Sequence, residues 1–240
     1  MALTRRAAVL LVAALAGAGV CGRLGIWQLD RAAQKNALQA AFDSHGAMPP
    51  LPAAELASDA ASAAGQVHRA IVIDGRWLAE HTVYLDNRQM NGRPGFFVIT
   101  PLLLADGSAV AVQRGWLPRN FVDRTQVAAP PLPATPVRVA GRIASGPARL
   151  FDFAGAASGA IRQNLDLTAF AAEVGRRLRP LSVVQEDGPL TPGDGLQRQW
   201  PRPAADVAKH YGYAFQWFAL ATLILGLYAW FQLIRPQQRR

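Results

Sequence analysis

Two long apolar segments, one near each end of the chain, dominate the pattern of hydrophobic and polar positions. The first runs from Ala7 to Leu29 and carries a single charge, at Arg23. The second runs from Tyr211 to Ile234 and carries none. Each segment is as long as the roughly 20 apolar residues that an α-helix needs to cross a bilayer. The pattern therefore predicts two transmembrane helices, at residues 7–29 and 211–234.

The first apolar segment has two interpretations. A basic start followed by an apolar centre is also the pattern of a cleaved signal peptide. Apolar character resumes after Arg23, however, and a charge near a helix end can reach the headgroup region. Trp27 then stands where an aromatic anchor is expected at a membrane interface. We predict a retained helix, with Ala14, Ala18 and Gly22 forming a stripe of small residues that lets a second helix approach.

Basic residues flank both segments on the same side. Arg5 and Arg6 precede the first segment, and Arg235, Arg239 and Arg240 follow the second. The positive-inside rule places such residues in the cytoplasm. We therefore expect residues 1–6 and 235–240 to be cytoplasmic and residues 30–210 to form an extracytoplasmic domain. The few residues before the first segment leave no room for a mitochondrial transit peptide, so we expect a bacterial inner membrane and a periplasmic domain.

Short apolar runs between the two segments predict β-strands. These runs are His68–Asp74, Thr82–Asn87, Phe96–Leu104, Ala109–Arg114, Val137–Ala144, Ile161–Leu167 and Leu181–Gln185. Turn signals separate them at Asp74-Gly75, Asn91-Gly92 and Asp106-Gly107. Asp30–Phe42 predicts a polar helix that continues the first span. Thr168 is expected to cap a helix that reaches Leu178 and that Pro180 ends. The segment Pro130–Pro136 is either a polyproline ligand or a stiff loop.

The predicted fold is a membrane-anchored α+β protein. Two transmembrane helices, one N-terminal and one C-terminal, flank a small antiparallel β-barrel or sandwich domain with one or two helices. The formal net charge is +9, but the arginines are scattered and form no basic run, so we expect no nucleic-acid partner. The one cysteine, Cys21, excludes an internal disulfide and a multi-thiolate metal site. We expect it to be a buried, inert thiol.

The sequence contains no motif for a catalytic site, so we expect no enzymatic activity. Among the histidines, His210 differs because it stands at the extracytoplasmic mouth of the second segment, with Trp217 on the same helical face. It either ends the loop as an interfacial polar residue or supplies one axial ligand to haem iron. Neutral imidazole is a common ligand of that metal.

The motifs along nearly the whole chain resemble the surfeit locus protein 1 family, assembly factors of cytochrome c oxidase. The pieces that carry the resemblance, in chain order, are Gly25–Arg31 (GIWQLDR) with Lys35 and Leu38, Val83–Arg88 (VYLDNR), Gly92–Leu102, Arg114–Pro118 (RGWLP) and His210–Phe218 (HYGYAFQWF). The sequence departs from the family pattern at Lys209, where Asn is frequent, and at Gln216, where a small hydroxyl residue is usual.

The resemblance implies a non-enzymatic membrane protein that assists haem a delivery to, or maturation of, subunit I of a haem–copper oxidase. Membrane lipids and haem a synthase are further expected partners. The haem-binding residues it suggests are His210, as ligand of the haem iron, with Trp217, Tyr213, Arg31 and Trp27. Arg31 and Lys35 either pair with the haem propionates or extend to the membrane interface. The alternative function is a haem-independent membrane scaffold that stabilises nascent oxidase subunits.

Overall fold

The computed structural model describes residues 5–123, 126–151, 159–190, 193–201 and 206–235. The chain divides into two compact units, one formed by residues 1–40 with 202–240 and the other by residues 41–201. Of the predicted cytoplasmic ends, only Arg5, Arg6 and Arg235 lie within the described residues, and Arg239 and Arg240 lie outside them.

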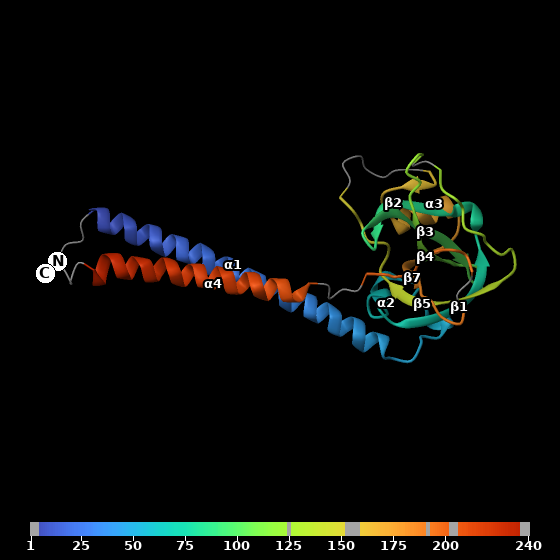
Figure 1. Ribbon diagram of the computed structural model, residues 1–240. Helices are drawn as coiled ribbons and strands as arrows, with labels where there is room; N and C mark the ends of the chain where they lie inside the picture. The colour runs from blue at the N-terminus through green and yellow to red at the C-terminus, as the bar shows by residue number, and fades with distance from the viewer. Residues whose placement is uncertain (1–4, 124–125, 152–158, 191–192, 202–205, 236–240) are drawn as a thin grey trace. The chain divides into compact units, whose positions relative to one another are not determined.

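The first unit is built from two long helices (Figure 1). Helix α1 spans Arg5–Gly46 without a break, so the apolar segment and the predicted polar helix at Asp30–Phe42 form one element. Helix α4 spans Val207–Ala229 and continues as a π-helical turn, η3, over Trp230–Ile234. Both helices are long and apolar enough to cross a membrane, and only 11% and 6% of their most apolar windows are buried. They therefore differ from the buried core helix of a soluble protein.

The second unit is a β-barrel-like domain, which confirms the predicted barrel alternative (Figure 1). Its elements in chain order are η1 (Ala53–Glu55), α2 (Ala60–Ala64), β1 (Ala70–Trp77), η2 (Ala79–His81), β2 (Val83–Met90), β3 (Arg93–Leu103), β4 (Ala109–Pro118), β5 (Val137–Ala144), β6 (Ile161–Arg162), α3 (Leu167–Val174) and β7 (Leu178–Gln185). The predicted strand at Ile161–Leu167 is thus reduced to two residues, and η1 and η2 are short 3-10 helices.

The sheet closes on itself through strand β1. The strand order is β1-β5-β7-β4-β3-β2-β6, and β1 also pairs with the far end of β3, where Trp77 lies opposite Leu102. The prediction of a purely antiparallel sheet is wrong, because β7 runs parallel to β4 and β6 runs parallel to β2. The chain crosses over through α3 before β7 and inserts that strand between β4 and β5. A parallel neighbour requires such a crossover.

The turn predictions separate into two that are confirmed and one that is wrong. Asn91 and Gly92 join β2 to β3 with φ of 52° and 74°, as a two-residue hairpin requires. Gly107 has a φ of 79° in the turn between β3 and β4. Gly75 instead lies inside β1, opposite Val137. A Cβ there would stand 2.7 Å from Leu102 Cγ, so this glycine marks a close approach of two strands.

Helix α3 begins and ends differently from the prediction. Its N-cap is Asp166, whose carboxylate accepts hydrogen bonds from the backbone N–H of Thr168 and Ala169 at 2.9 and 3.1 Å. The helix ends at Gly175 in the left-handed conformation, not at Pro180. Pro180 lies inside β7, where the pairing with β4 shifts register between Leu178 and Ser182. A proline has no backbone N–H to donate. It is tolerated there because an irregular ladder does not need a hydrogen bond from every residue.

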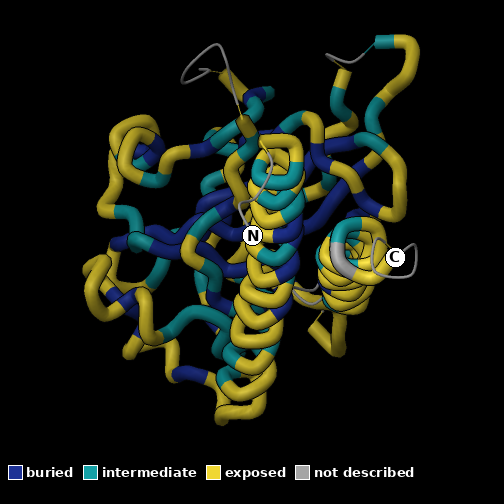
Figure 2. Tube along the Cα trace, turned by 90° about the vertical axis from the view of Figure 1, so that its left-hand side faces the viewer, coloured by how far each residue is buried: buried dark blue, intermediate teal, exposed yellow. Residues whose placement is uncertain are grey.

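Buried apolar side chains gather on both sides of the sheet, and Figure 2 shows the strands as the most buried segments. One cluster fills the barrel interior with inward-facing residues that include Ile73, Val112 and Val183. A second cluster lies under α3 and includes Phe170 and Trp116. A third, smaller cluster includes Phe96, Val98 and Leu117, so alternate residues of the strands serve different parts of the core.

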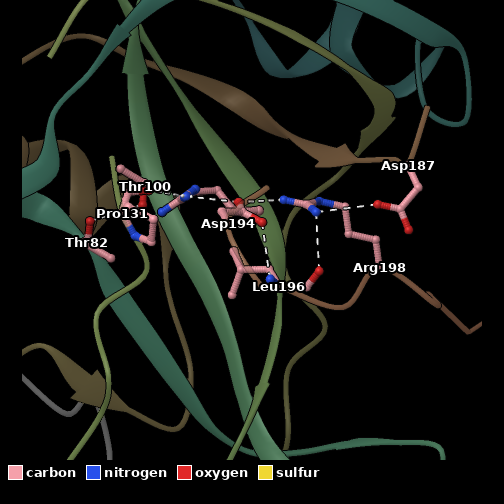
Figure 3. A network of polar contacts seen from close by, with 8 residues as sticks. Thr82, Thr100, Pro131, Asp187, Asp194, Leu196 and Arg198 are labelled. Carbon is pink, nitrogen blue, oxygen red and sulfur yellow. Dashed lines mark hydrogen bonds and ion pairs between the residues drawn. The ribbon is translucent and has the colours of Figure 1, made fainter. Parts of the chain in front are cut away.

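A buried charged network joins the segment after β7 to strand β4. Arg114 of β4, 1% exposed, donates from Nη2 to Asp194 Oδ2 at 3.1 Å, and Arg198 donates to the same oxygen at 2.7 Å. Arg198 also contacts the carboxylate of Asp187 at 3.4 Å. Figure 3 shows these contacts from Asp194 through Arg198 to Asp187. Because Asp194 is 8% exposed, two buried guanidinium groups depend on one buried carboxylate.

We expect Gly141→Ala to destabilise the barrel by about 1–3 kcal/mol, the usual penalty for overpacking. A Cβ on this β5 residue would clash with the Val184 carbonyl oxygen and stand 2.9 Å from Val183 Cγ1. Thermal unfolding of the full chain in detergent measures the effect. Gly188→Ala, where a Cβ would meet nothing within 4 Å, is the matched control and should melt like the parent. Equal melting of both variants would contradict the close packing.

We expect Asp194→Asn to destabilise the protein more strongly, by about 3–5 kcal/mol, because it leaves Arg114 and Arg198 buried without their shared counter-charge. Asp74→Asn removes a carboxylate that is 62% exposed and paired with Arg138. That control should cost under about 1 kcal/mol. Chemical denaturation of the full chain compares the two. If Asp194→Asn lowers the free energy of unfolding no more than Asp74→Asn does, the network does not hold the segment after β7.

Candidate functional site

Helices α1 and α4 pack along a seam with a heptad period. In each helix, a stripe of buried or half-buried residues recurs at alternating steps of three and four. The stripes are Leu11, Ala14, Ala18, Cys21, Gly25, Gln28 and Ala32 in α1, and Val207, His210, Ala214, Trp217, Ala221, Ile224 and Tyr228 in α4. This spacing is typical of helix pairs that wind gently around each other. Most of the α1 positions carry small side chains, which allow a close approach.

The closest approach along the seam is at Gly25, where a Cβ would stand 2.7 Å from Phe218 Cζ. The predicted small-residue stripe is therefore correct for Ala14 and Ala18 but not for Gly22, where a Cβ would meet nothing within 4 Å. Cys21 is buried in the seam, as predicted. At Gly25 the two helices therefore meet through the Phe218 ring, which packs directly against the α1 backbone.

His210 lies in the first turns of α4 and contacts Gln28 of α1. Its Nδ1 is 2.7 Å from Gln28 Oε1. Because an amide oxygen can only accept, Nδ1 carries the proton in this contact. In the neutral imidazole, Nε2 then keeps a lone pair and is the nitrogen available to a metal ion or a proton. Helix α4 begins at Val207, before the apolar segment at 211–234 that was predicted to span the membrane, so His210 is a helical residue and does not end a loop.

Charged side chains surround the beginning of α4. Lys209 Nζ is 3.0 Å from Asp206 Oδ1. This hydrogen bond is the main cause that lowers the pKa of the Asp206 carboxyl, and the nearby positive charges of Lys209 and Lys35 lower it further. The end of α4 that holds His210 therefore combines an ionised carboxylate with two ammonium groups.

The structure brings together some of the predicted site residues and separates others. Trp217 lies on the seam, two helical turns from His210 on the same face, and is half-buried. Trp27 and Tyr213 are about half exposed and face away from the seam. Arg31 is exposed, and its Nη1 donates to Gln34 Oε1 of the same helix at 2.8 Å.

Gln28 is the site residue whose role the sequence did not indicate. It belongs to the GIWQLDR motif, which gave no sign of a hydrogen bond to His210. The available signal was its position, because Gln28 is a polar residue in the heptad stripe of an otherwise apolar helix. Asn36 and Tyr211 form a second polar contact between the helices, from Nδ2 to the phenolic oxygen at 3.2 Å. Within the described residues, no group of three or more His, Cys, Asp or Glu side chains could hold a metal ion.

The motif residues of the barrel have a structural role in the described contacts. Trp116, fully buried, donates from Nε1 to the backbone oxygen of Arg88 at 2.9 Å. Arg88, 4% exposed, donates in turn to the backbone oxygen of Gln163 at 2.7 Å. These side chains join β4, β2 and the residue after β6, so the contacts described here hold the barrel together.

Comparisons with known proteins agree on one family. The model of the SURF1 family matches residues 15–222. The cytochrome oxidase assembly protein SHY1 of Saccharomyces cerevisiae is 28% identical over 41% of this chain and 25% of its own length. A SURF1-like protein of Rickettsia felis is 27% identical over 43% of this chain and 44% of its own. Another, of Rickettsia bellii, is 23% identical over 85% of this chain and 83% of its own.

The matches to the yeast and Rickettsia felis proteins thus span less than half of those relatives, whereas the family model spans both long helices in part and the whole barrel. That model covers well over half of the chain. The protein belongs to the SURF1 family.

Proposed function

We propose that this protein assists the assembly of a haem–copper cytochrome c oxidase. Family membership and the similarity to a yeast protein named for oxidase assembly support this role. The polar barrel surface and the paired apolar helices suit a protein that works beside membrane-embedded subunits. Subunit I is the proposed partner, because it is the subunit that receives haem, and haem a synthase is the proposed donor of that haem.

The proposed placement is a bacterial inner membrane, with α1 and α4 crossing the bilayer, both termini in the cytoplasm and the barrel in the periplasm. The length and the low burial of the two apolar helices support the crossing. Arg5, Arg6 and Arg235 support the orientation through the positive-inside rule. Trp27, half exposed on α1, has the side chain expected at the interface.

The contact between His210 and Gln28 carries the proposal that the protein handles haem a as cargo. A histidine that presents a metal-binding nitrogen usually donates its other ring N–H to a fixed acceptor, which sets the tautomer and the ring orientation. Gln28 Oε1 is such an acceptor at 2.7 Å. The donor set fits one axial position of a haem iron, and a single ligand suits a protein that must release its cargo.

The other predicted residues fit a haem only in part. Trp217 shares a face with His210 and can pack against a macrocycle. Trp27 and Tyr213 present aromatic surface away from the seam, and the Arg31 guanidinium reaches Gln34. These three residues would have to contact a haem from outside the helix pair. Arg31 would then pair with a propionate through the N–H groups that Gln34 does not occupy.

The alternative function is a scaffold that stabilises nascent oxidase subunits without haem. The exposed positions of Trp27, Arg31 and Tyr213 favour it, because they leave these side chains available to a partner helix. The two functions differ in what His210 does. A scaffold needs only the helix seam, whereas a haem carrier needs the imidazole.

We expect haem a to copurify with the full chain when it is coexpressed with a haem a synthase, and His210→Ala to lose the band in the reduced-minus-oxidised spectrum. Gln28→Leu should weaken haem binding about 10–100-fold, as loss of an orienting partner does. His45→Ala and Gln34→Leu are the matched controls. His45 contacts the Val67 carbonyl oxygen, and Gln34 accepts from Arg31, so both variants should keep the band.

Absence of the band from the parent, in membranes rich in haem a, would exclude haem carriage. If oxidase assembly in a strain that lacks the protein is then restored equally by the parent and by His210→Ala, the scaffold function stands.

We expect a membrane-impermeant maleimide to label Val122→Cys, but not Arg5→Cys, in intact spheroplasts of a Cys21→Ser background. Val122 is 97% exposed in the barrel, and the proposed topology places it outside the membrane. Mass shift on a gel measures the labelling, and permeabilised cells give the maximum for each position. The reverse pattern, with only Arg5→Cys labelled, would invert the topology.

A further inference from the structure

One end of the barrel interior is a cavity of about 260 Å³. Its lining comes from strands β1, β4, β5 and β7 and from the loops next to them, and consists of Trp77, Arg114, Pro131, Pro133, Val137, Arg138, Val139, Gln185 and Leu190. Arg114 ends the inward-facing row of β4 that includes Val110 and Val112. Gln185 ends the corresponding row of β7 after Leu181 and Val183. The barrel core therefore changes from apolar to polar at this mouth.

Both polar side chains at the mouth keep hydrogen-bonding atoms without partners. Arg114 is 1% exposed, and its Nε and Nη1 find no partner among the described residues. Gln185 is 2% exposed, and its Oε1 finds none either. Buried polar atoms are nearly always hydrogen-bonded, so such a pair beside a cavity calls for a ligand. The ligand must accept a hydrogen bond from the Arg114 guanidinium and donate one to the Gln185 amide oxygen.

The charge at the mouth favours an anion. The Arg114 guanidinium uses only Nη2, which donates to Asp194 Oδ2 at 3.1 Å and to the Pro131 carbonyl oxygen at 3.2 Å. Arg198 shares the same carboxylate oxygen. Burial is the main cause that lowers the pKa of Arg114, against the stabilising charge of Asp194. With Asp187 the network already holds two carboxylates for its two guanidinium groups, so the anion is favoured because the unpartnered Nε and Nη1 donors belong to a cation.

The walls and the size of the cavity limit what can enter. Trp77 lies against the Arg114 guanidinium at 5.3 Å from the ring centroid, and Val137, Val139 and the two prolines complete an apolar surface. Pockets for drug-sized ligands begin at about 300 Å³, so this cavity holds a group the size of one amino-acid residue, not a haem. The segment Pro130–Pro136, which was predicted as a ligand or a stiff loop, lies in the loop between β4 and β5 and contributes Pro131 and Pro133 to one wall.

We propose that the barrel mouth binds the C-terminal residue of a polypeptide with an apolar last side chain. The terminal carboxylate accepts from Arg114, the adjacent backbone N–H donates to Gln185 Oε1, and the side chain packs between Trp77, Pro133 and Val137. The C-terminal residue of a chain places a carboxylate and an N–H on the same Cα in this way, and protein modules capture such ends by the same chemistry. This inference does not depend on haem binding by the helix pair.

Calorimetric titration of the full chain in detergent tests the site. The probes are an N-acetylated hexapeptide that ends in leucine with a free carboxylate, the same peptide as its C-terminal amide, and N-acetyl-L-leucine. We expect the free acid to bind at least about tenfold tighter than the amide, because the amide lacks the charge that Arg114 requires. N-acetyl-L-leucine should bind as well, since it carries all the recognised groups.

Variants locate the binding. Gln185→Leu should weaken binding of the free acid about tenfold, because it removes the acceptor for the N–H. Val137→Phe should abolish binding by filling the cavity. Arg76→Gln is the control: this exposed arginine of β1 precedes Trp77 but does not line the cavity, so binding should change less than about twofold. Melting temperatures establish that each variant is folded, and Arg114 is kept because it also supports Asp194.

Four results would overturn the proposal. These are no heat from the hexapeptide acid with the parent, equal affinity for acid and amide, parent-like affinity in both Gln185→Leu and Val137→Phe, and loss of binding in Arg76→Gln alone. Binding of N-acetyl-L-leucine without the hexapeptide would likewise reject a polypeptide end and leave a site for small carboxylates.

Discussion

The close approach of α1 and α4 is the constraint on which the proposed haem site depends. Two apolar helices in lipid gain nothing from the hydrophobic effect when they associate, so van der Waals packing and interhelical hydrogen bonds must hold them together. Gly25 allows the Phe218 ring to lie against the α1 backbone. The same seam brings Gln28 to His210. One contact thus joins the helices and fixes which imidazole nitrogen carries the proton.

Local signals in the sequence predicted most elements of the barrel. Asn91-Gly92 specifies a hairpin because both residues tolerate positive φ, and alternating runs located six of the seven strands to within a few residues. The prediction of a turn at Asp74-Gly75 was wrong because an Asp-Gly pair suits both a turn and a close approach between strands. The prediction that Pro180 ends a helix was wrong because a proline is excluded only from a regular strand ladder. The register shift beside it depends on β4, which lies far away in sequence.

The candidate sites were predictable only where one helix contains the whole pattern. His210 and Trp217 share a face by helical spacing alone, and this relation is confirmed. The pairing of His210 with Gln28 joins residues from opposite ends of the chain and requires the register of the two helices. Arg114 and Asp194 are likewise brought together only by the barrel. Neither contact has a signature in local sequence, because both depend on tertiary packing.

The position of β7 has a consequence for how the domain forms. This strand lies between β4 and β5, although it follows both in the chain. During synthesis, β4 and β5 therefore have an open gap between them until residue 185 has emerged, and non-local pairing of this kind is intrinsically slow. Until then, the half-built sheet exposes two unpaired strand edges. A chain that is threaded across a membrane from its N-terminus would hold this vulnerable intermediate on the far side, where the last strand must arrive before the barrel can close.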